Sequence, residues 1–544
     1  MLGQMMSMPL TINALMRHAL RNHPDVEIVS VTADNPRHRT TVGAALRRSA
    51  QLANALAARG VQPGDRVATL AWNDYRHYET YYAVSCMGAV LHTINPRLHP
   101  EQLAYIVNHA EDSWLLLDPA FVPLLSAIKG KVPSLKGAIV LCPADALPDV
   151  DAGMELLSYE ALLEGQPDSY DWPELEENTA SSLCYTSGTT GNPKGVLYSH
   201  RSTVLHAMAS VAKDAMCMGA ADCVLPVVPM FHVNAWSIPY ATAMVGAKLV
   251  FPGPKMGDGE TLQKLMETEA VTLAAGVPTV WLGLLNYLKA SGKRIDSVER
   301  MIVGGSACPV SLMKAFLNDY QAEIVHAWGM TEMSPMGTIC RPIAAHAQMR
   351  AEEQWSWRVK QGRTLFPVEM IIVDDEGQEL PWDGKTFGAL KVRGPWIIDS
   401  YYRMGDKPTL DADGWFDTGD VATIDPQGYM QITDRTKDVI KSGGEWISSI
   451  DLENLAMSHP DVAEAAVIGL PHPKWDERPL LVVVRKPESQ VSAQQILDFF
   501  EGKIAKWWTP NGVEFVDALP HGATGKVQKM TLREQFAGYQ FPDA

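Results

Sequence analysis

Hydrophobic and polar positions alternate with two different periods along the first two thirds of the chain. Residues 41–60 carry apolar side chains at helical spacing and end in glycine, and a short β-branched run follows at residues 66–72. The same order of helix pattern, turn and buried strand pattern recurs at residues 77–91 and 104–118. Apolar strands that are separated by helices are typical of parallel sheets covered by helices. The pattern over about residues 40–350 therefore predicts an α/β fold.

The pattern changes in the last third of the chain. Residues 368–381 and 388–398 have the composition of strands joined by Asp/Gly turns, which indicates a smaller, more antiparallel part that is β-barrel-like. Near the end of the chain, helix, strand, strand and helix patterns follow one another in a compact α+β unit. We therefore expect a large N-terminal domain of parallel-rich α/β sheets with the small β-barrel-like part at residues 1–433. A small mobile α+β domain is expected at residues 434–544.

Composition and charge narrow the class of protein. The chain has 544 residues, 46% hydrophobic and 20% charged, which is the balance of a globular protein with more than one domain. Its formal net charge of −17 argues against non-specific binding of nucleic acid, because a polyanion is repelled at long range. The seven cysteines are scattered without a Cys-x-x-Cys pair, which favours reduced thiols in a cytoplasm. The sequence shows neither a leader nor an apolar run long enough for a transmembrane segment, so we expect a cytoplasmic protein.

The stretch YTSGTTGNPKG at residues 185–195 has the composition of an anion-binding loop. Its hydroxyl side chains, glycines and the Lys194 ammonium allow backbone amides and a point charge to approach phosphate. It is not a Walker A loop, because Gly195 stands where that motif has serine or threonine. The structural alternative for such a stretch is a polar loop between two strands.

Further motifs follow this loop in order along the chain. They are VPMFHVNAW at residues 228–236, VGGSACP at 303–309, HAWGMTE at 326–332, DGWFDTGD at 413–420, DRTKDVIKSGGEWIS at 434–448 and GATGKVQK at 522–529. With the loop, they resemble the adenylate-forming superfamily, which covers acyl-CoA synthetases, luciferase-like enzymes and peptide-synthetase adenylation domains. The resemblance extends from about residue 40 to the end of the chain and is strongest toward bacterial medium-chain fatty-acid–CoA ligases.

The resemblance implies ATP, Mg²⁺ and coenzyme A as cofactors and assigns residues to them. The implied binding residues are Thr186, Ser187, Gly188, Thr189, Thr190, Lys194, Gly305, Ser306, His326, Ala327, Trp328, Thr331, Asp420, Arg435, Lys437, Lys441, Gly443, Gly444 and Trp446. The implied substrate residues are Val233, Trp236 and Gly304, and the implied catalytic residues are Lys526, His232 and Glu332. Where the superfamily usually has a tyrosine against the adenine, this chain has Trp328, so we expect a shifted geometry with stacking retained.

Four of these residues would act on the nucleotide. Magnesium is a hard ion that takes oxygen ligands, and the resemblance implies the Glu332 carboxylate, with the Thr186 hydroxyl, as its ligands. Asp420 is expected to accept hydrogen bonds from the ribose hydroxyls. Arg435 is expected beside it, with an interdomain ion pair as the structural alternative. Lys526 is expected to stabilise the charge that develops when a carboxylate attacks the α-phosphate.

The remaining assignments concern the acid, the thiol and a hinge. Lys437 occupies the hinge position, which absorbs a backbone rotation between two half-reactions. Gly443 and Gly444 would leave room for the pantetheine arm of CoA. Because the attacking carboxylate is already ionised near neutral pH, His232 would orient it rather than act as a base. Trp236 is a candidate gate of an acyl tunnel; without the resemblance, core packing is the simpler interpretation of both side chains.

The implied activity is a ligation in two steps. A fatty acid, expected to be of medium chain length, and Mg·ATP give an acyl-adenylate and pyrophosphate, and the CoA thiol then displaces AMP. Methylmercaptopropionate–CoA ligases share nearly the same motifs, so this acid, or another short or aromatic acid, is the alternative substrate. An adenylation enzyme that loads a carrier protein and a luciferase-like oxygenase are the alternatives from other classes. The family also implies a homodimer through the large domain.

Overall fold

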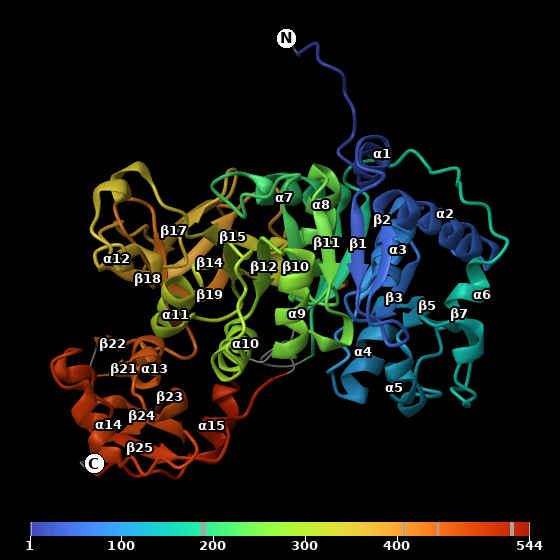
Figure 1. Ribbon diagram of the computed structural model, residues 1–544. Coiled ribbons are helices and arrows are strands. Elements are labelled where there is room, and N and C mark those ends of the chain that lie inside the picture. Colours follow the sequence, from blue (N-terminus) through green and yellow to red (C-terminus); the bar gives the residue numbers. More distant parts are fainter. Residues whose placement is uncertain (2, 187–191, 406–407, 443–444, 523–526, 543–544) are drawn as a thin grey trace.

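The fold has a large N-terminal part and a smaller C-terminal part. A computed structural model describes residues 1–544 apart from 2, 187–191, 406–407, 443–444, 523–526 and 543–544. In Figure 1 the large part extends from blue through orange, and the smaller part, in red, lies below its yellow and orange end. The predicted fold class, a large α/β domain followed by a small α+β domain, is confirmed.

A central sheet forms the middle of the large part. Its strand order is β16-β15-β14-β13-β12-β10-β11-β1-β2, and the strands from β14 to β1 in this order run parallel. The strands are β1 (Glu27–Ser30), β2 (His38–Thr41), β10 (Cys223–Pro226), β11 (Lys248–Phe251), β12 (Leu273–Gly276), β13 (Arg300–Val303), β14 (Glu323–Gly329), β15 (Met336–Ile339) and β16 (Arg363–Thr364). Strands β10, β12 and β13 are buried at every position, as expected for parallel strands that are covered on both faces.

A second, N-terminal sheet has the order β7-β6-β5-β3-β4-β8-β9. It is parallel except for β9, which returns antiparallel to β8. Its strands are β3 (Arg66–Leu70), β4 (Val90–Thr93), β5 (Asp112–Leu117), β6 (Gly137–Val140), β7 (Glu155–Ser158), β8 (Ala180–Tyr185) and β9 (Gly195–Ser199). The β8–β9 hairpin places the two ends of the predicted anion-binding loop side by side, because Tyr185 pairs with Gly195.

Two further sheets complete the fold. The part predicted to be barrel-like is an antiparallel sheet of β17 (Glu369–Val373), β18 (Phe387–Arg393), β19 (Phe416–Ile424) and β20 (Met430–Arg435). The C-terminal sheet has the strands β21 (Ile440–Ser442), β22 (Glu445–Ile447), β23 (Val462–His472), β24 (Asp476–Arg485) and β25 (Gly512–Phe515). Strand β20 still pairs with β19 up to Arg435, so the chain leaves the large part after this residue.

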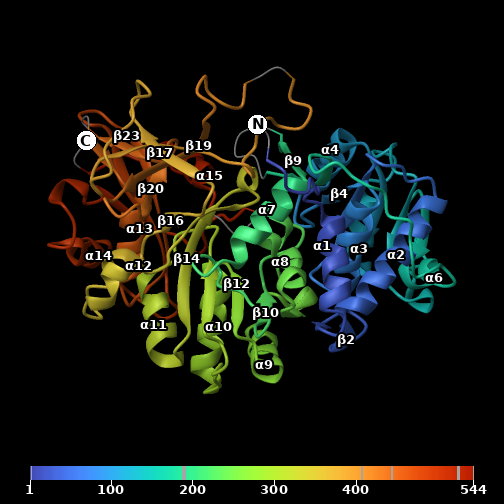
Figure 2. The same ribbon diagram turned by 90° about the horizontal axis from the view of Figure 1, so that it is seen from above.

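Helices separate and cover the sheets. They are α1 (Ile12–Asn22), α2 (Val42–Ala58), α3 (Tyr75–Cys86), α4 (Pro100–Ala110), α5 (Val122–Ala127), α6 (Tyr159–Leu163), α7 (His200–Val211), α8 (Ile238–Val245), α9 (Gly259–Glu269), α10 (Pro278–Ser291), α11 (Val310–Tyr320), α12 (Trp355–Arg358), α13 (Ser449–Met457), α14 (Ala493–Phe500) and α15 (Lys529–Gln535). Short 3₁₀ turns are η1 (Pro119–Phe121), η2 (Ala144–Ala146), η3 (Val233–Ser237), η4 (Gly253–Lys255), η5 (Thr331–Met333), η6 (Ala344–Gln348) and η7 (Lys506–Trp508). Helices α1, α2, α3, α7 and α8 lie side by side (Figure 2), and α3 contacts strands of both large sheets. This helix layer fills the space between the two sheets and contributes to one shared apolar core.

Local sequence signals explain several helix boundaries. Thr41 and Asp74 accept hydrogen bonds from backbone N–H groups in the first turns of α2 and α3, which are the caps that such residues usually provide. The helix predicted at residues 41–60 is therefore present as α2, and the predicted strands of the α+β unit are present as β23 and β24. Helix α1 and strand β1 were not predicted, since they precede the region of about residues 40–350 whose periodicity predicts the α/β fold.

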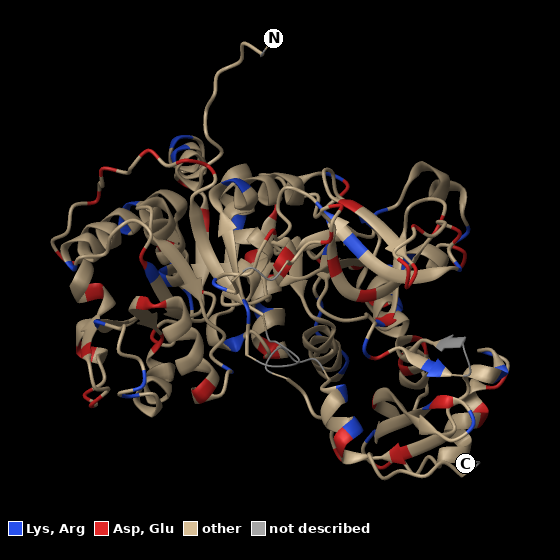
Figure 3. Ribbon diagram, turned by 180° about the vertical axis from the view of Figure 1, so that it is seen from behind, with Lys and Arg blue, Asp and Glu red and all other residues tan. Residues whose placement is uncertain are grey.

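Charged residues occur throughout both parts of the molecule. In the view of Figure 3, Lys and Arg are interspersed with Asp and Glu along the ribbon. Among the residues that the structure describes, no helix combines the length and the apolar composition needed to cross a membrane.

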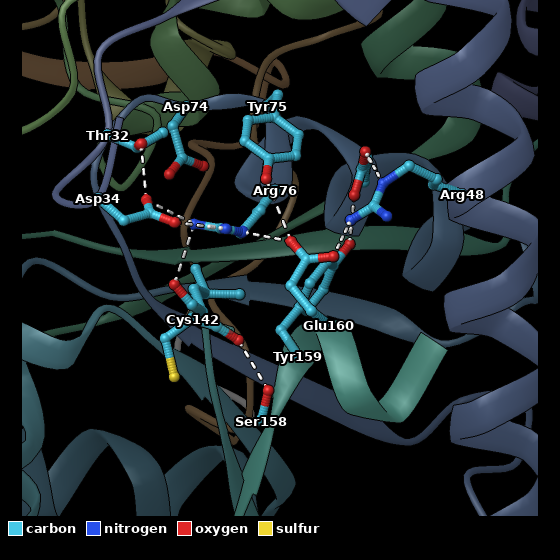
Figure 4. A network of polar contacts seen from close by, with 12 residues as sticks. Thr32, Asp34, Arg48, Asp74, Tyr75, Arg76, Cys142, Ser158, Tyr159 and Glu160 are labelled. Carbon is cyan, nitrogen blue, oxygen red and sulfur yellow. Dashed lines mark hydrogen bonds and ion pairs between the residues drawn. The ribbon is translucent and has the colours of Figure 1, made fainter. Parts of the chain in front are cut away.

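A partly buried ionic network joins the helices of the N-terminal sheet to the chain between β1 and β2 (Figure 4). The Glu160 carboxylate on α6 accepts hydrogen bonds from Arg76 on α3 at 2.8 Å and from Arg48 on α2 at 2.9 Å. Arg76 also pairs with Asp34 at 3.1 Å, and Arg48 pairs with Glu79 at 2.7 Å. Removing Glu160 would leave the buried Arg76 guanidinium with less compensating charge, which disfavours the packing of the helices that carry them. The network therefore fixes how α2, α3 and α6 pack.

Candidate active site

A cavity of about 750 Å³ lies where the two large sheets and the antiparallel sheet meet. Its walls are formed by residues that follow the carboxyl ends of β8, β10, β12 and β13, and by the end of β14. Parallel α/β sheets commonly bind ligands outside the carboxyl ends of their strands, and the volume lies in the range of small-molecule sites. The topology thus collects side chains from distant parts of the sequence in one cavity.

Most of the residues implied by the resemblance line this cavity. They are Thr186, Lys194, His232, Val233, Trp236, Gly304, Gly305, Ser306, His326, Ala327, Trp328, Thr331, Glu332, Asp420, Arg435 and Lys437. Lys441 is exposed on β21 and is not part of the lining. Trp446 is described only as a backbone position of β22, paired with Lys441. Ser187, Gly188, Thr189, Thr190, Gly443, Gly444 and Lys526 lie outside the described residues.

The described ends of the anion-binding loop open onto the cavity. Thr186 follows β8, and its backbone N–H donates a hydrogen bond of 2.9 Å to the carbonyl of Lys194. The Lys194 side chain is exposed to the cavity, with its Nζ 4.6 Å from the centre of the Tyr401 ring. A hydroxyl and an ammonium are thereby held at the mouth of the loop, where both could contact phosphate oxygens.

Glu332 is a buried carboxylate in the wall opposite this loop. It lies in η5 with only 7% of its surface exposed, and its Oε1 accepts a hydrogen bond of 2.7 Å from the Tyr401 hydroxyl. Burial raises the pKa of the Glu332 carboxyl above its usual value, while the hydrogen bond from Tyr401 acts in the opposite direction. Among the residues that the structure describes, no group of three or more His, Cys, Asp or Glu side chains is arranged for a metal. A single carboxylate beside a phosphate site suits a magnesium ion, which usually takes one or two carboxylates plus substrate phosphates.

The side chains of Trp328 and Arg435 contact Asp420 in the cavity wall. The indole N–H of Trp328 donates to Oδ2 at 2.9 Å, and the Arg435 Nε lies 3.2 Å from Oδ1. Asp420 and Arg435 face each other across the β19–β20 pair, so the strand register itself brings them together. Trp328, Gly304 and Gly305 all belong to the cavity lining. The arrangement gives an aromatic surface for a base next to a carboxylate for hydroxyl groups.

The segment after His232 has an unusual backbone. Val233, Asn234, Ala235, Trp236 and Ser237 all have φ between 47° and 60°, so five consecutive residues are left-handed. Such a conformation costs roughly 1–2 kcal/mol per residue for L-amino acids and persists only where surrounding contacts compensate for it. The left-handed turn therefore fixes the direction in which Val233 and Trp236 reach the cavity wall.

Two residues of this turn have clear roles in packing. The Asn234 side chain is buried; its Nδ2 donates to Ser182 Oγ at 2.9 Å and its Oδ1 accepts from Tyr81 at 3.3 Å. The Trp236 indole packs against Gly304, where a Cβ atom would lie 3.1 Å from the ring. A side chain at position 304 would therefore require the indole to shift by a few tenths of an ångström, which the sequence alone did not indicate.

The lining contains residues that the motifs did not identify. Tyr401, Arg97, Met256 and Gln361 belong to the cavity wall, but they lie outside the quoted motifs. Each enters the wall through the tertiary fold. The sequence around Tyr401, DSYYRMGD, has neither a glycine-rich pattern nor a ligand spacing that would have marked it.

The fold and this cavity define an α/β protein with a cavity of small-molecule size at the carboxyl ends of its parallel strands. Two family descriptions match the chain: "AMP-binding enzyme" over residues 16–402 and "AMP-binding enzyme C-terminal domain" over residues 451–526. The chain belongs to the AMP-binding enzyme family, as its motifs predicted.

Individual relatives are similar over nearly their whole length. The chain is 54% identical to the 3-methylmercaptopropionyl-CoA ligase of Ruegeria lacuscaerulensis, over 98% of this chain and 99% of that protein. It is 50% identical to the medium-chain-fatty-acid–CoA ligase of Ectopseudomonas oleovorans, over 98% of each. The crystal structure of the anthranilate CoA ligase AuaEII in complex with anthranoyl-AMP aligns with a TM-score of 0.87 at 25% identity, covering 98% of this chain and 99% of that one.

Proposed function

We propose that the protein is an ATP-dependent acid–CoA ligase that acts on a medium-chain fatty acid through an acyl-adenylate. The observation that carries this proposal is the single cavity lined by Lys194, Glu332, Asp420 and Trp236. These side chains offer a phosphate contact, a metal ligand, a ribose contact and an apolar wall within one volume. The identities of 54% and 50% to two acid–CoA ligases support the reaction class.

In the first half-reaction, an oxygen of the substrate carboxylate attacks the α-phosphorus of ATP. A P–O bond to the acid forms, the bond to the β-phosphate bridging oxygen breaks, and pyrophosphate leaves with its negative charge. Thr186 and Lys194 hold the phosphates, and His232 orients the carboxylate. Fixed positive charge stabilises the transition state of such a transfer. Lys526 is proposed to supply it, and this residue lies outside the described part of the chain.

A magnesium ion fits the described side chains. Glu332 and the Thr186 hydroxyl would hold it, and it would neutralise charge on the phosphates of bound ATP. Tyr401 holds Oε1 of Glu332 in a hydrogen bond of 2.7 Å, and Glu332 is part of the cavity wall.

In the second half-reaction, the CoA thiol attacks the carbonyl carbon of the adenylate. A thioester forms, the C–O bond to the phosphate breaks, and AMP leaves while the thiol proton passes to solvent. We infer that the small domain, proposed as residues 434–544, rotates about Lys437 between the steps and presents Gly443 and Gly444 to the pantetheine arm. Lys437 lines the cavity, and burial lowers the pKa of its ammonium. With a backbone hinge at the cavity wall, one rotation would withdraw Lys526 from the cavity and bring Gly443 and Gly444 to it.

The apolar part of the lining supports an aliphatic acyl group. It is formed by Val228, Phe231, Trp236, Met256, Val277 and Val280. An unbranched chain that carries no charge buries its surface there without leaving a polar group unpaired. A short thioether acid has the same property, and the 54% identity to a 3-methylmercaptopropionyl-CoA ligase favours it as the second candidate substrate.

A substrate panel tests the proposal. Purified protein with ATP, Mg²⁺ and CoA is offered straight-chain acids from acetate to palmitate, methylmercaptopropionate and a cinnamate, and AMP and pyrophosphate are measured with and without CoA. We expect CoA-dependent AMP release with a maximum kcat/KM on acids of medium length. A maximum on methylmercaptopropionate would replace the substrate and keep the mechanism. Pyrophosphate release without any CoA-dependent product would overturn the ligase proposal in favour of a carrier-loading enzyme, and light emission with luciferin would favour an oxygenase.

A cytoplasmic location is proposed as well. All seven cysteines are free thiols, which suits a reducing compartment. A homodimer through the large domain stays a prediction, which the particle mass measured by light scattering in solution would test.

A further inference from the structure

The segment at residues 398–403 connects the two walls of the cavity that carry Lys194 and Glu332. Its Ile398 N–H donates to the backbone carbonyl of Glu332 at 2.8 Å, and its Tyr402 N–H donates to the carbonyl of Gly195 at 2.9 Å. Arg403 continues to helix α4, where it donates to the carbonyl of His109 at 3.1 Å. The segment is thus fastened at one end to η5 and at the other to the hairpin β8–β9.

The side chain of Tyr401 lies in the middle of this segment and contacts both charged groups. Its hydroxyl donates to Glu332 Oε1 at 2.7 Å, and the face of its ring receives Lys194 Nζ at 4.6 Å from the centroid. The distance from Lys194 to the ring lies within the range of a cation–π interaction. The half-buried Tyr401 side chain therefore contacts the Glu332 carboxylate through its hydroxyl and the Lys194 ammonium through its ring.

This arrangement matters because a lysine and a glutamate in one cavity attract each other. A direct pair between them would withdraw the ammonium from the phosphates and the carboxylate from the metal. The contacts with Tyr401 give each group a partner that attracts it less strongly than a full opposite charge would. The contact with Tyr401 uses only Oε1 of Glu332 and pairs the Lys194 ammonium with a ring face and not with a hydrogen-bond acceptor.

We propose that Tyr401 is a positioning residue, which keeps Glu332 oriented for Mg²⁺ and keeps Lys194 oriented for the ATP phosphates. This inference rests on the proposed function, and it assigns to Tyr401 a role that acts through the two neighbouring groups. The hydroxyl orients Glu332, the proposed metal ligand, and the ring orients Lys194, the proposed phosphate contact. The two contributions are therefore separable by substitution.

The experiment compares Tyr401→Phe and Tyr401→Leu with the wild type, and Tyr402→Phe serves as the matched control. The control removes a hydroxyl from the adjacent tyrosine, whose ring faces His109 instead of Glu332. Calorimetry measures the Kd of ATP with excess Mg²⁺ and with EDTA, in the absence of acid substrate, so that the readout does not depend on turnover. Thermal unfolding of each variant is recorded in parallel.

We expect Tyr401→Phe to reduce the gain in ATP affinity on adding Mg²⁺ by about tenfold, since a hydrogen bond to a charged group is lost. Its Kd for ATP in EDTA should stay within about twofold of the wild type, because the ring that receives Lys194 is retained. Tyr401→Leu should weaken binding in EDTA as well. In a Glu332→Gln background, Tyr401→Phe should change the magnesium-dependent gain no further, because its effect passes through that carboxylate.

Other outcomes overturn the inference. If Tyr401→Phe behaves like Tyr402→Phe, or weakens binding equally with Mg²⁺ and EDTA, the hydroxyl does not position a metal ligand. A lowered unfolding temperature with an unchanged magnesium-dependent gain would assign Tyr401 to folding alone. If the wild type itself binds no ATP in this assay and releases no AMP with any acid of the panel, the proposed function fails, which distinguishes that failure from this one.

Discussion

The indole N–H of Trp328 is the group that holds one oxygen of Asp420, at 2.9 Å, while Arg435 holds the other at 3.2 Å. A phenol ring in the same place would stack on a base but would present its polar group at a different point. Trp328 therefore combines a stacking surface with a donor for the carboxylate. Asp420 is only 5% exposed, and Trp328 and Arg435 both help to orient its carboxylate.

We expect Trp328→Phe to raise the KM for ATP about tenfold, with kcat changed less than about threefold. The substitution keeps an aromatic face and removes one hydrogen bond to a charged group, which is typically worth about 1.5–3 kcal/mol. Initial rates of AMP formation with ATP and with 2′,3′-dideoxy-ATP measure the effect. The preference for ATP should shrink in the variant, because Asp420 is less well oriented for the ribose. An equal loss for both nucleotides would show that the N–H only supports packing.

The sequence predicted those residues of the cavity that occur in ordered motifs. It did not predict residues that reach the cavity only through folding. Glu332, Asp420 and Trp328 were predicted because their neighbours in the chain resemble a family pattern, and all three line the cavity. Tyr401 was missed because its partners, Lys194 and Glu332, are distant in sequence and meet it only in space.

The left-handed turn at Val233–Ser237 is an element that no propensity predicts. Each of its residues adopts a disfavoured backbone conformation. Contacts with residues that are remote in sequence, such as that of Asn234 with Ser182, compensate for the energetic cost of this conformation. His206 on α7 supports the end of the turn, since its Nδ1 lies 2.9 Å from Ser237 Oγ. Its Nε2 accepts a hydrogen bond of 3.0 Å from the Met336 N–H of β15. The imidazole must therefore be neutral, with its proton on Nδ1.

Burial lowers the pKa of His206 to about 3, and this gives the turn a pH dependence. Between that value and the unfolded value near 6.5, the unfolded chain binds a proton that the folded chain does not, so stability falls as pH falls. Because of His206, we expect the free energy of unfolding of the wild type to fall by about 1.4 kcal/mol from pH 7.5 to pH 5.5. In His206→Gln this loss should be absent, because glutamine can accept from Met336 but does not titrate.

Urea unfolding of both proteins at pH 7.5 and 5.5 measures the difference. The variant should be less stable than the wild type at pH 7.5, and the gap should narrow at pH 5.5. The other buried histidines are common to both proteins and cancel in the comparison. A gap that stays constant or widens on acidification would contradict a neutral His206 in the folded state.

For the whole molecule, periodicity predicted the alternation of helices and parallel strands, and the change to antiparallel strands, because both signals are local. It did not predict that β1 pairs with β11, since the register Ile28 to Leu249 joins segments more than 200 residues apart. The same limit applies to the helix layer between the sheets, which forms from α1, α2, α3, α7 and α8 only when the two sheets close around it.

The proposed rotation of the small domain leads to a prediction about the whole molecule. The chain leaves β20 at Arg435, Thr436 donates its N–H to Gly419 at 3.0 Å, and Lys437 follows directly at the cavity wall. Proline at position 437 fixes φ near −65° and so restricts the backbone rotation that a hinge requires. We expect Lys437→Pro to retain the first half-reaction, measured as acid-dependent exchange of pyrophosphate into ATP, within about tenfold. Thioester formation should fall by about 100-fold or more, because the domain cannot leave its first position.

Lys437→Ala is the matched control, since it removes the ammonium but leaves the backbone free, and it should support both steps. Equal losses of exchange and thioester formation in the proline variant would contradict the hinge, because a residue that only binds nucleotide affects both half-reactions alike.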